Sequence, residues 1–133
     1  MNDRVEQFAA KRSTAIFPGG AVGQHLLADL FGVAADRLRD ERMLCEVFRQ
    51  ALNEADFTIL HEMTHKFPTG GEGVTGIFLL AESHAAFHSY PERHYLAADI
   101  FSCGGNEPRD VLEAVIESLA PTHVETDIVV RGR

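Results

Sequence analysis

The chain has 133 residues, of which 45% are hydrophobic, and a formal net charge of -8 at pH 7. This length indicates one domain with a core of its own, and the acidic balance argues against nucleic acid or an anionic membrane as partner, because both need basic patches. No apolar run approaches the roughly 20 residues of a membrane span. Two cysteines without a CxxC pair argue against a disulfide scaffold and indicate free thiols in the cytoplasm.

The predicted elements begin after a polar N-terminal arm. Residues 1–21 show no clear periodicity and lack the apolar segment of a secretory signal, so we interpret them as an extension before a domain over residues 22–133. Residues 22–31 alternate loosely and predict a strand. Residues 35–55 carry apolar side chains at helical spacing and predict one helix, with Asp36 as its cap and Cys45 as core filler.

More strands and a second helix follow. Residues 57–67 alternate and predict a strand, whereas residues 74–81 are nearly all apolar and predict a strand that is buried on both faces. Further strands are expected over residues 84–89, 95–102 and 122–130, with a helix over residues 107–119. The order β-α-β-β-β-β-α-β predicts an α+β two-layer sandwich, in which two helices cover one face of a mostly antiparallel sheet.

One metal motif stands within the second predicted strand. Residues 61–65, His-Glu-Met-Thr-His, match the HExxH signature of zinc proteases. That signature works on a helix, whereas on a strand the two histidines would lie about 13 Å apart, too far for one ion. The motif makes a zinc hydrolase a rival hypothesis. Because the histidines would lie too far apart on a strand, we predict no metal at this motif.

Reactive side chains gather directly after the apolar strand, in residues 81–92. Ser83 with His84 and His88 suggests a hydrolase, but the nucleophile elbow GxSxG is absent. Taken singly, each of these residues is more simply a hydrogen-bonded serine or histidine at the end of a strand.

Taken together, three segments resemble the motifs of the bacterial and archaeal S-adenosylmethionine decarboxylases. They are residues 82–84 (ESH), 87–92 (FHSYPE) and 99–104 (DIFSCG). Residues 23–29 (GQHLLAD) also resemble the opening strand of that family, and residues 73–76 (GVTG) its lead into the cleavage strand. The similarity covers roughly residues 22–133 in unchanged order, and it implies a proenzyme that cleaves itself to make a pyruvoyl cofactor.

The resemblance implies that Ser83 is both nucleophile and cofactor precursor. Its Oγ attacks the carbonyl of Glu82, and the chain is cut into a β chain of residues 1–82 and an α chain of residues 83–133. The pyruvoyl group left by Ser83 then forms a Schiff base with the substrate and withdraws electrons during decarboxylation. By the same resemblance, His88 accepts a proton during processing, Thr75 assists the acyl shift, and Cys103 returns a proton to the substrate.

The resemblance also implies the substrate contacts. Phe67 and Tyr90 fall where the family stacks aromatic rings on adenine, and Glu92 falls where it holds the ribose hydroxyls. The position of Tyr90 is usually tryptophan, which this chain lacks, and the turn before residue 74 is longer than usual and introduces Glu72. The favoured function is decarboxylation of S-adenosylmethionine for spermidine synthesis. Pyruvoyl-dependent decarboxylation of arginine or ornithine is the alternative, because Glu72 would suit a cationic substrate.

A hypothesis of another class is a non-catalytic relative that regulates an active copy. The joint presence of Glu82, Ser83, His88 and Cys103 argues against it. The resemblance further implies a homodimer of αβ units, with each active site near the subunit interface.

Overall fold

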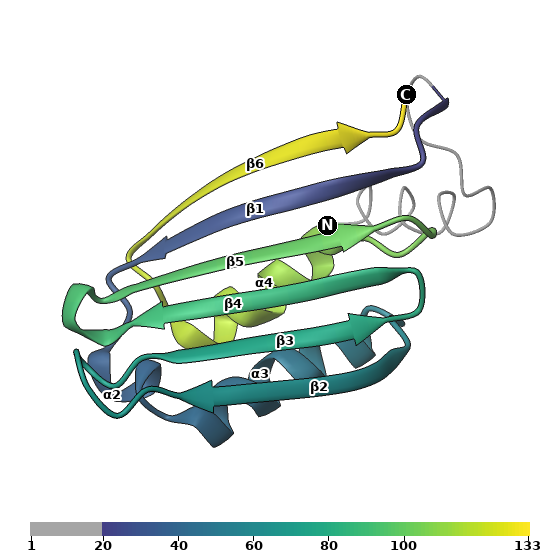
Figure 1. Cartoon of the computed structure of the whole chain (residues 1–133). Coiled ribbons are helices and arrows are strands. Elements are labelled where there is room, and N and C mark those ends of the chain that lie inside the picture. The colour runs from purple at the N-terminus through teal and green to yellow at the C-terminus, as the bar shows by residue number, and fades with distance from the viewer. Residues whose placement is uncertain (1–19) are drawn as a thin grey trace.

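The computed structural model describes residues 20–133. They form one six-stranded sheet in the order β2-β3-β4-β5-β1-β6, in which every neighbouring pair is antiparallel (Figure 1). The strands are β1 (Gly23–Phe31), β2 (Ile59–Lys66), β3 (Val74–Leu80), β4 (Ser83–Tyr90), β5 (Tyr95–Ser102) and β6 (His123–Arg131). The predicted strands are thus confirmed, with ends that shift by one or two residues. The predicted extension over residues 1–21 lies almost entirely outside the described residues.

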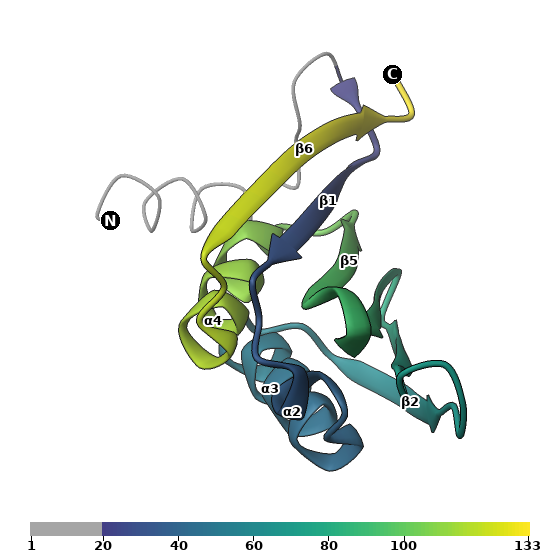
Figure 2. The same ribbon diagram turned by 90° about the vertical axis from the view of Figure 1, so that its left-hand side faces the viewer.

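The helices form a second layer on one face of the sheet (Figure 2). They are α2 (Ala35–Leu38), α3 (Glu41–Glu54) and α4 (Pro108–Leu119), and a 3₁₀ turn, η2 (Pro91–Arg93), joins β4 to β5. The predicted α+β two-layer sandwich is therefore confirmed. Within residues 20–133, no helix combines the length and the apolar character that crossing a membrane requires.

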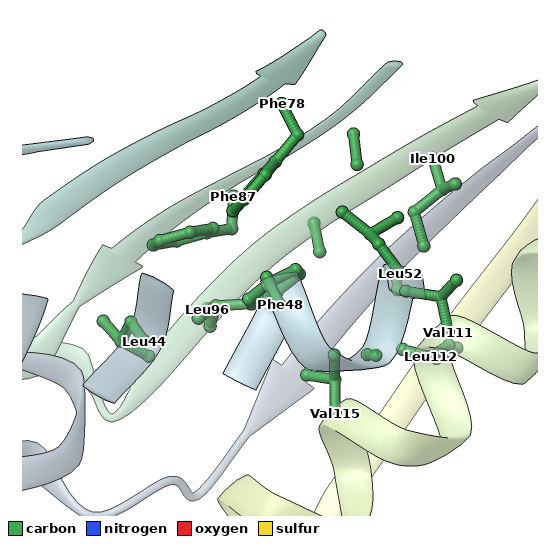
Figure 3. Close-up of a cluster of buried hydrophobic side chains, with 14 of the residues drawn as sticks. Leu44, Phe48, Leu52, Phe78, Phe87, Leu96, Ile100, Val111, Leu112 and Val115 are labelled. Atoms are coloured by element: carbon green, nitrogen blue, oxygen red, sulfur yellow. The ribbon is translucent and has the colours of Figure 1, made fainter. Parts of the chain in front are cut away.

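The core lies between the two layers and is built around Phe48 of α3. Its ring stacks on Phe87 of β4 at a centroid distance of 4.5 Å, and it lies 6.4 Å from the ring of Phe78 of β3 (Figure 3). Val111 and Val115 bring α4 against the same core, and all five side chains are almost fully buried. Each such side chain contributes about 1.5–3 kcal/mol through burial, which fixes the helices on this face.

The ring of Phe87 needs the absence of a side chain at Gly76. The two residues are paired across β3 and β4, and a Cβ on Gly76 would lie 2.2 Å from a ring carbon of Phe87. The glycine therefore lets the aromatic ring lie flat over β3.

The prediction that residues 74–81 are buried on both faces is wrong. Val74, Phe78 and Leu80 are buried, but Ile77 and Leu79 are 52% and 51% exposed. The helices cover only one face of the sheet, so alternate residues of every strand point to the other face, which we call the open face. Its exposed large apolar side chains include Leu27, Met63, Ile77, Leu79 and Val129.

The prediction of one helix over residues 35–55, capped by Asp36, is also wrong. The helix is interrupted at Arg39 and Asp40, and the side chain of Asp40 accepts a hydrogen bond from the Met43 amide at 3.0 Å at the start of α3. Asp36 instead pairs with Arg39 at 3.3 Å. An aspartate that caps an interior turn satisfies free amides there, so it starts a new helix.

Candidate active site

The predicted cleavage position lies in the tight turn between β3 and β4. Leu80 pairs with Ser83, so Ala81 and Glu82 alone form the turn. Glu82 has φ 59°, in the left-handed region that disfavours residues with a side chain. The bond between Glu82 and Ser83 therefore follows a residue under backbone strain, of the order of 1–3 kcal/mol.

Cys103 contacts both sides of this bond. Its amide lies 3.4 Å from Ser83 Oγ and donates a hydrogen bond to it, and its thiol donates a hydrogen bond to the Glu82 carbonyl oxygen. Cys103 directly follows β5, which pairs with β4 along its whole length and so brings the two strand ends together. We call Glu82, Ser83 and Cys103 the cleavage turn.

The loop that carries Cys103 is anchored to the end of α3. The buried Ser102 hydroxyl donates to the Asn106 carbonyl at 2.7 Å, and the Asn106 amide donates to the carbonyls of Ala55 and Asp56 at 3.0 and 2.8 Å. These bonds use carbonyls that the helix end leaves without helical partners. They hold Cys103 against the turn without any contribution from its own side chain.

The other predicted site residues meet at the opposite end of the β3–β4 hairpin. Thr75 and His88 are paired across the strands, and Thr75 Oγ1 lies 3.0 Å from His88 Nδ1. With Phe67, Tyr90 and Glu92 they line one cleft of about 390 Å³, which we call the substrate cleft.

Ser89 fixes the wall of this cleft from the helix side. Its buried hydroxyl donates to the Leu38 carbonyl at 2.7 Å and accepts from the Val74 amide at 2.8 Å. Tyr90 stacks on Tyr95 at a centroid distance of 5.5 Å. The part of the cleft wall formed by Ser89 and Tyr90 is therefore held by α2, β3 and β5 together.

Within a single chain, the cleavage turn and the substrate cleft lie far apart. His88 stands five residues after Ser83 on the same strand, which corresponds to about 17 Å at 3.3–3.4 Å per residue. His88 is therefore out of reach of Ser83 of its own chain, although it contacts Thr75, which the resemblance separately assigns to processing.

The HExxH segment lies on β2, as predicted, and its glutamate contacts side chains of α3. Glu62 pairs with Arg49 of α3 at 2.5 Å and accepts from the Cys45 thiol at 2.9 Å. The hydrogen bonds from Arg49 and then from Cys45 lower the pKa of Glu62 to about 2, and burial and Glu62 raise the pKa of Cys45 to about 11. Cys45, predicted as core filler, is half-buried and donates a hydrogen bond to the carboxylate of this ion pair.

Sequence reasoning missed a cluster on the open face beside the cleavage turn. Asp99 Oδ1 lies 3.0 Å from His25 Nε2 and 3.4 Å from His84 Nε2. The alternation of each strand places these residues on one face, but the register that brings three strands together is not readable from the sequence. Glu72, which motivated a cationic substrate, lies 3.7 Å from the amine of Lys66 and is thereby partnered.

Comparisons with known proteins point in one direction. A family model described as S-adenosylmethionine decarboxylase matches residues 24–132. The chain is 34% identical to the S-adenosylmethionine decarboxylase proenzyme of Persephonella marina, over 84% of this chain and 83% of that one. It is equally identical to the proenzyme of the same name from Methanococcus vannielii, over 84% of this chain and 90% of that one.

A solved structure extends the similarity to three dimensions. The crystal structure of the adenosylmethionine decarboxylase from Aquifex aeolicus superposes with a TM-score of 0.76 and 30% sequence identity. The match covers 85% of this chain and 92% of the other.

Proposed function

Because this chain belongs to the S-adenosylmethionine decarboxylase family, we propose that it cleaves itself and decarboxylates S-adenosylmethionine, giving the aminopropyl donor for spermidine synthesis. The observation that carries this proposal is the double contact of Cys103 with Ser83 Oγ and with the Glu82 carbonyl oxygen. This double contact supports cleavage of the peptide bond between Glu82 and Ser83, which a pyruvoyl enzyme of this kind has to break.

The cleavage turn fits an attack by Ser83 on the preceding carbonyl. The thiol of Cys103 polarises the Glu82 carbonyl and offers a hydrogen bond to the charge that grows on its oxygen. The amide of Cys103 donates to the attacking hydroxyl oxygen and so favours its deprotonated form. Opening the turn also releases the strain at Glu82, which favours the step.

The residues around position 83 fit a pyruvoyl group formed there. When present, that group supplies a ketone that binds an amine and draws electrons from the bond to a neighbouring carboxylate. The Cys103 thiol lies beside residue 83 and holds a proton at Sγ, which suits the return of a proton to the substrate carbon. The loop bonds of Asn106 keep that thiol in place through the reaction.

The substrate cleft suits an adenosyl group better than a small basic amino acid. A cleft of about 390 Å³ is within the range for ligands of this size, and the aromatic rings of Phe67 and Tyr90 offer stacking surfaces. Glu92 supplies a carboxylate that accepts hydrogen bonds from ribose hydroxyls. Glu72 lies 3.7 Å from the Lys66 amine and is not among the residues that line the cleft, so it gives no support to the arginine or ornithine alternative.

The separation of the two groups of residues supports a homodimer whose active sites span the interface. Each chain offers a cleavage turn at one end of its open face and a Thr75–His88 pair at the other end. The apolar side chains of the open face, such as Ile77 and Leu79, provide a surface for a second copy to cover. In this arrangement the His88 of one chain acts on the Ser83 of its partner.

Denaturing mass spectrometry tests the cleavage. We expect wild-type protein to give two fragments, residues 1–82 and 83–133, with a pyruvoyl N-terminus on the second, and Ser83→Ala to give one intact chain. The purified wild type is then incubated with S-adenosylmethionine, arginine and ornithine, and CO2 is expected from the first alone. A wild type that stays intact in folded form would refute the proposal, and CO2 from arginine or ornithine would reassign the substrate.

Mixing two inactive variants tests the interface. Ser83→Ala lacks the nucleophile and His88→Ala lacks the proton acceptor, so each variant alone is expected to stay uncut. In a co-expressed mixture the dimer contains one complete site, in which His88 of the Ser83→Ala chain serves Ser83 of the other chain. Only the His88→Ala chain is then expected to be cut, and the two chains are distinguished by mass. No cleavage in a confirmed heterodimer would contradict the shared site.

A further inference from the structure

Three side chains of the open face converge beside the cleavage turn and take no part in the chemistry proposed above. They are His25 of β1, His84 of β4 and Asp99 of β5. Their ligand atoms all lie within 4.8 Å of one another, and both histidine Nε2 atoms approach the same carboxylate oxygen. Such convergence of two imidazoles and a carboxylate is the donor set of many transition-metal sites.

The backbone fixes this arrangement. Phe101 of β5 pairs with His84 on one side and with His25 on the other, and Asp99 stands two residues along the same strand on the same face. The Phe101 ring stacks on His84 and meets His25 edge-on, each at a centroid distance of 5.8 Å. The two imidazole rings lie edge to face, with their centroids 5.4 Å apart and their planes at 87°.

The distances are those of a coordination polyhedron. A tetrahedral zinc ion with bonds of about 2.0–2.1 Å separates its ligand atoms by roughly 3.4 Å. The two nitrogen–oxygen separations in the structure, 3.0 and 3.4 Å, are close to this value, and all three ligand atoms lie within 4.8 Å of one another. The side chains of Asp99 and His84 are 30% and 48% exposed in a single chain, so these three residues do not by themselves fill the space around an ion.

We propose that His25, His84 and Asp99 form a binding site for a divalent transition-metal ion of the zinc class. Nitrogen donors and a single carboxylate select zinc, cobalt, nickel or copper over magnesium and calcium, which prefer oxygen ligands. Because His84 follows Ser83 directly, the ion holds the start of β4 against β5 and β1. After cleavage, when residue 83 becomes a chain end, this tether fixes the position of the new terminus.

The test measures cobalt binding to tag-free Ser83→Ala protein, which stays intact, so its result does not depend on whether the chain cleaves. One Co²⁺ per chain is expected, with visible absorption of a four-coordinate ion, which Zn²⁺ displaces and a large excess of Mg²⁺ does not. Adding Asp99→Asn or His25→Gln is expected to weaken binding more than about tenfold.

The matched control is the double substitution His61→Gln with His65→Gln, which removes the other histidine pair of the sheet. It is expected to bind Co²⁺ as tightly as the parent protein. Folding of each variant is checked by circular dichroism, and His84→Gln, at an exposed position, replaces any variant that fails to fold. The proposal is overturned if the parent binds no stoichiometric Co²⁺, or if the His61 and His65 substitutions abolish binding while Asp99→Asn retains it.

Discussion

Cys103 uses two different groups for its two contacts at the cleavage turn, and substitution separates them. The amide that contacts Ser83 Oγ belongs to the backbone and survives any substitution except proline. The contact with the Glu82 carbonyl depends on the thiol. We therefore propose that the residue suggested as proton donor to the substrate also acts earlier, during formation of the pyruvoyl group.

Cys103→Ala is expected to slow self-cleavage by roughly a hundredfold, because loss of one donor to a developing oxyanion typically has that effect. Cys103→Ser keeps a hydrogen-bond donor on a shorter bond. Its rate of self-cleavage is expected to lie between that of the alanine variant and that of the wild type. The fraction of cut chain against time, measured by denaturing mass spectrometry, checks both. Cys45→Ala is the control, since the other thiol lies at the α3–β2 contact. Equal rates for wild type and Cys103→Ala would contradict this role.

Gly76→Ala tests the core at a single methyl group. The added Cβ meets the ring of Phe87, which is fully buried and stacks on Phe48 at a centroid distance of 4.5 Å. We expect a loss of about 1–3 kcal/mol in the free energy of unfolding, measured by urea denaturation. Gly70→Ala, in open space but with φ 69°, reports the backbone strain alone. A variant as stable as the wild type would show that the ring can repack.

The resemblance to a known family proposes the identities of the site residues from the sequence, and these stay predictions, whereas the sequence does not give their grouping. Ser83, His88 and Cys103 were proposed from the motifs that carry that resemblance. Spacing along a chain does not reveal that Cys103 lies at the turn while His88 lies with Thr75 at the far end of the hairpin. That grouping depends on strand register, and the histidine–aspartate cluster was missed for the same reason.

At the level of elements, the contact between α3 and β2 contains a carboxylate with a strongly shifted pKa. Arg49 and Cys45 on the helix bind Glu62 on the strand and lower its pKa to about 2. The pKa of Glu62 is lower in the folded than in the unfolded chain. This pairing therefore stabilises the fold above about pH 4.5 and loses its effect as the pH falls toward 2.

Glu62→Gln is therefore expected to reduce the stability difference between pH 7 and pH 3. Because Arg49 and Glu62 are 42% and 29% exposed, solvent screening limits the loss at pH 7 to about 1 kcal/mol. Urea denaturation at both pH values measures the free energy of unfolding of the wild type and the variant. Glu54→Gln, at the exposed end of α3 without an ion pair among the described contacts, is the matched control. If the free energy of unfolding of Glu62→Gln depends on pH as that of the wild type does, the contribution assigned to Glu62 is contradicted.

The elements themselves were largely predictable, and the errors have physical causes. The run Val74–Leu80 is apolar on both faces, and a sequence does not reveal that no helix covers Ile77 and Leu79. The helix over residues 35–55 was predicted as one because periodicity continues across Asp40, whose cap starts a second helix. In the first case the tertiary surroundings decided the outcome, and in the second a local cap did.

For the molecule as a whole, the proposed homodimer makes the open face decide whether the active site is complete. Ile77→Lys places a charge in its apolar part and is expected to give a monomer that cleaves itself far more slowly, because burying an unpaired charge costs several kcal/mol. Light scattering during size-exclusion chromatography measures the mass, and mass spectrometry measures the cut. Glu117→Lys, on the exposed side of α4, is the control. A monomeric Ile77→Lys that cleaves at the wild-type rate would show that one chain suffices.

The strand order has a consequence for the molecule after its backbone is severed. The piece before the cut contributes β1, β2 and β3, and the later piece contributes β4, β5 and β6, yet β1 lies between β5 and β6. The two pieces are thus interleaved, and neither can leave without stripping β1 from two neighbours and β3 from β4 at once. The two fragments of the cleaved protein should therefore purify together as one complex. Its melting should depend on protein concentration, as expected for two polypeptides that fold only together.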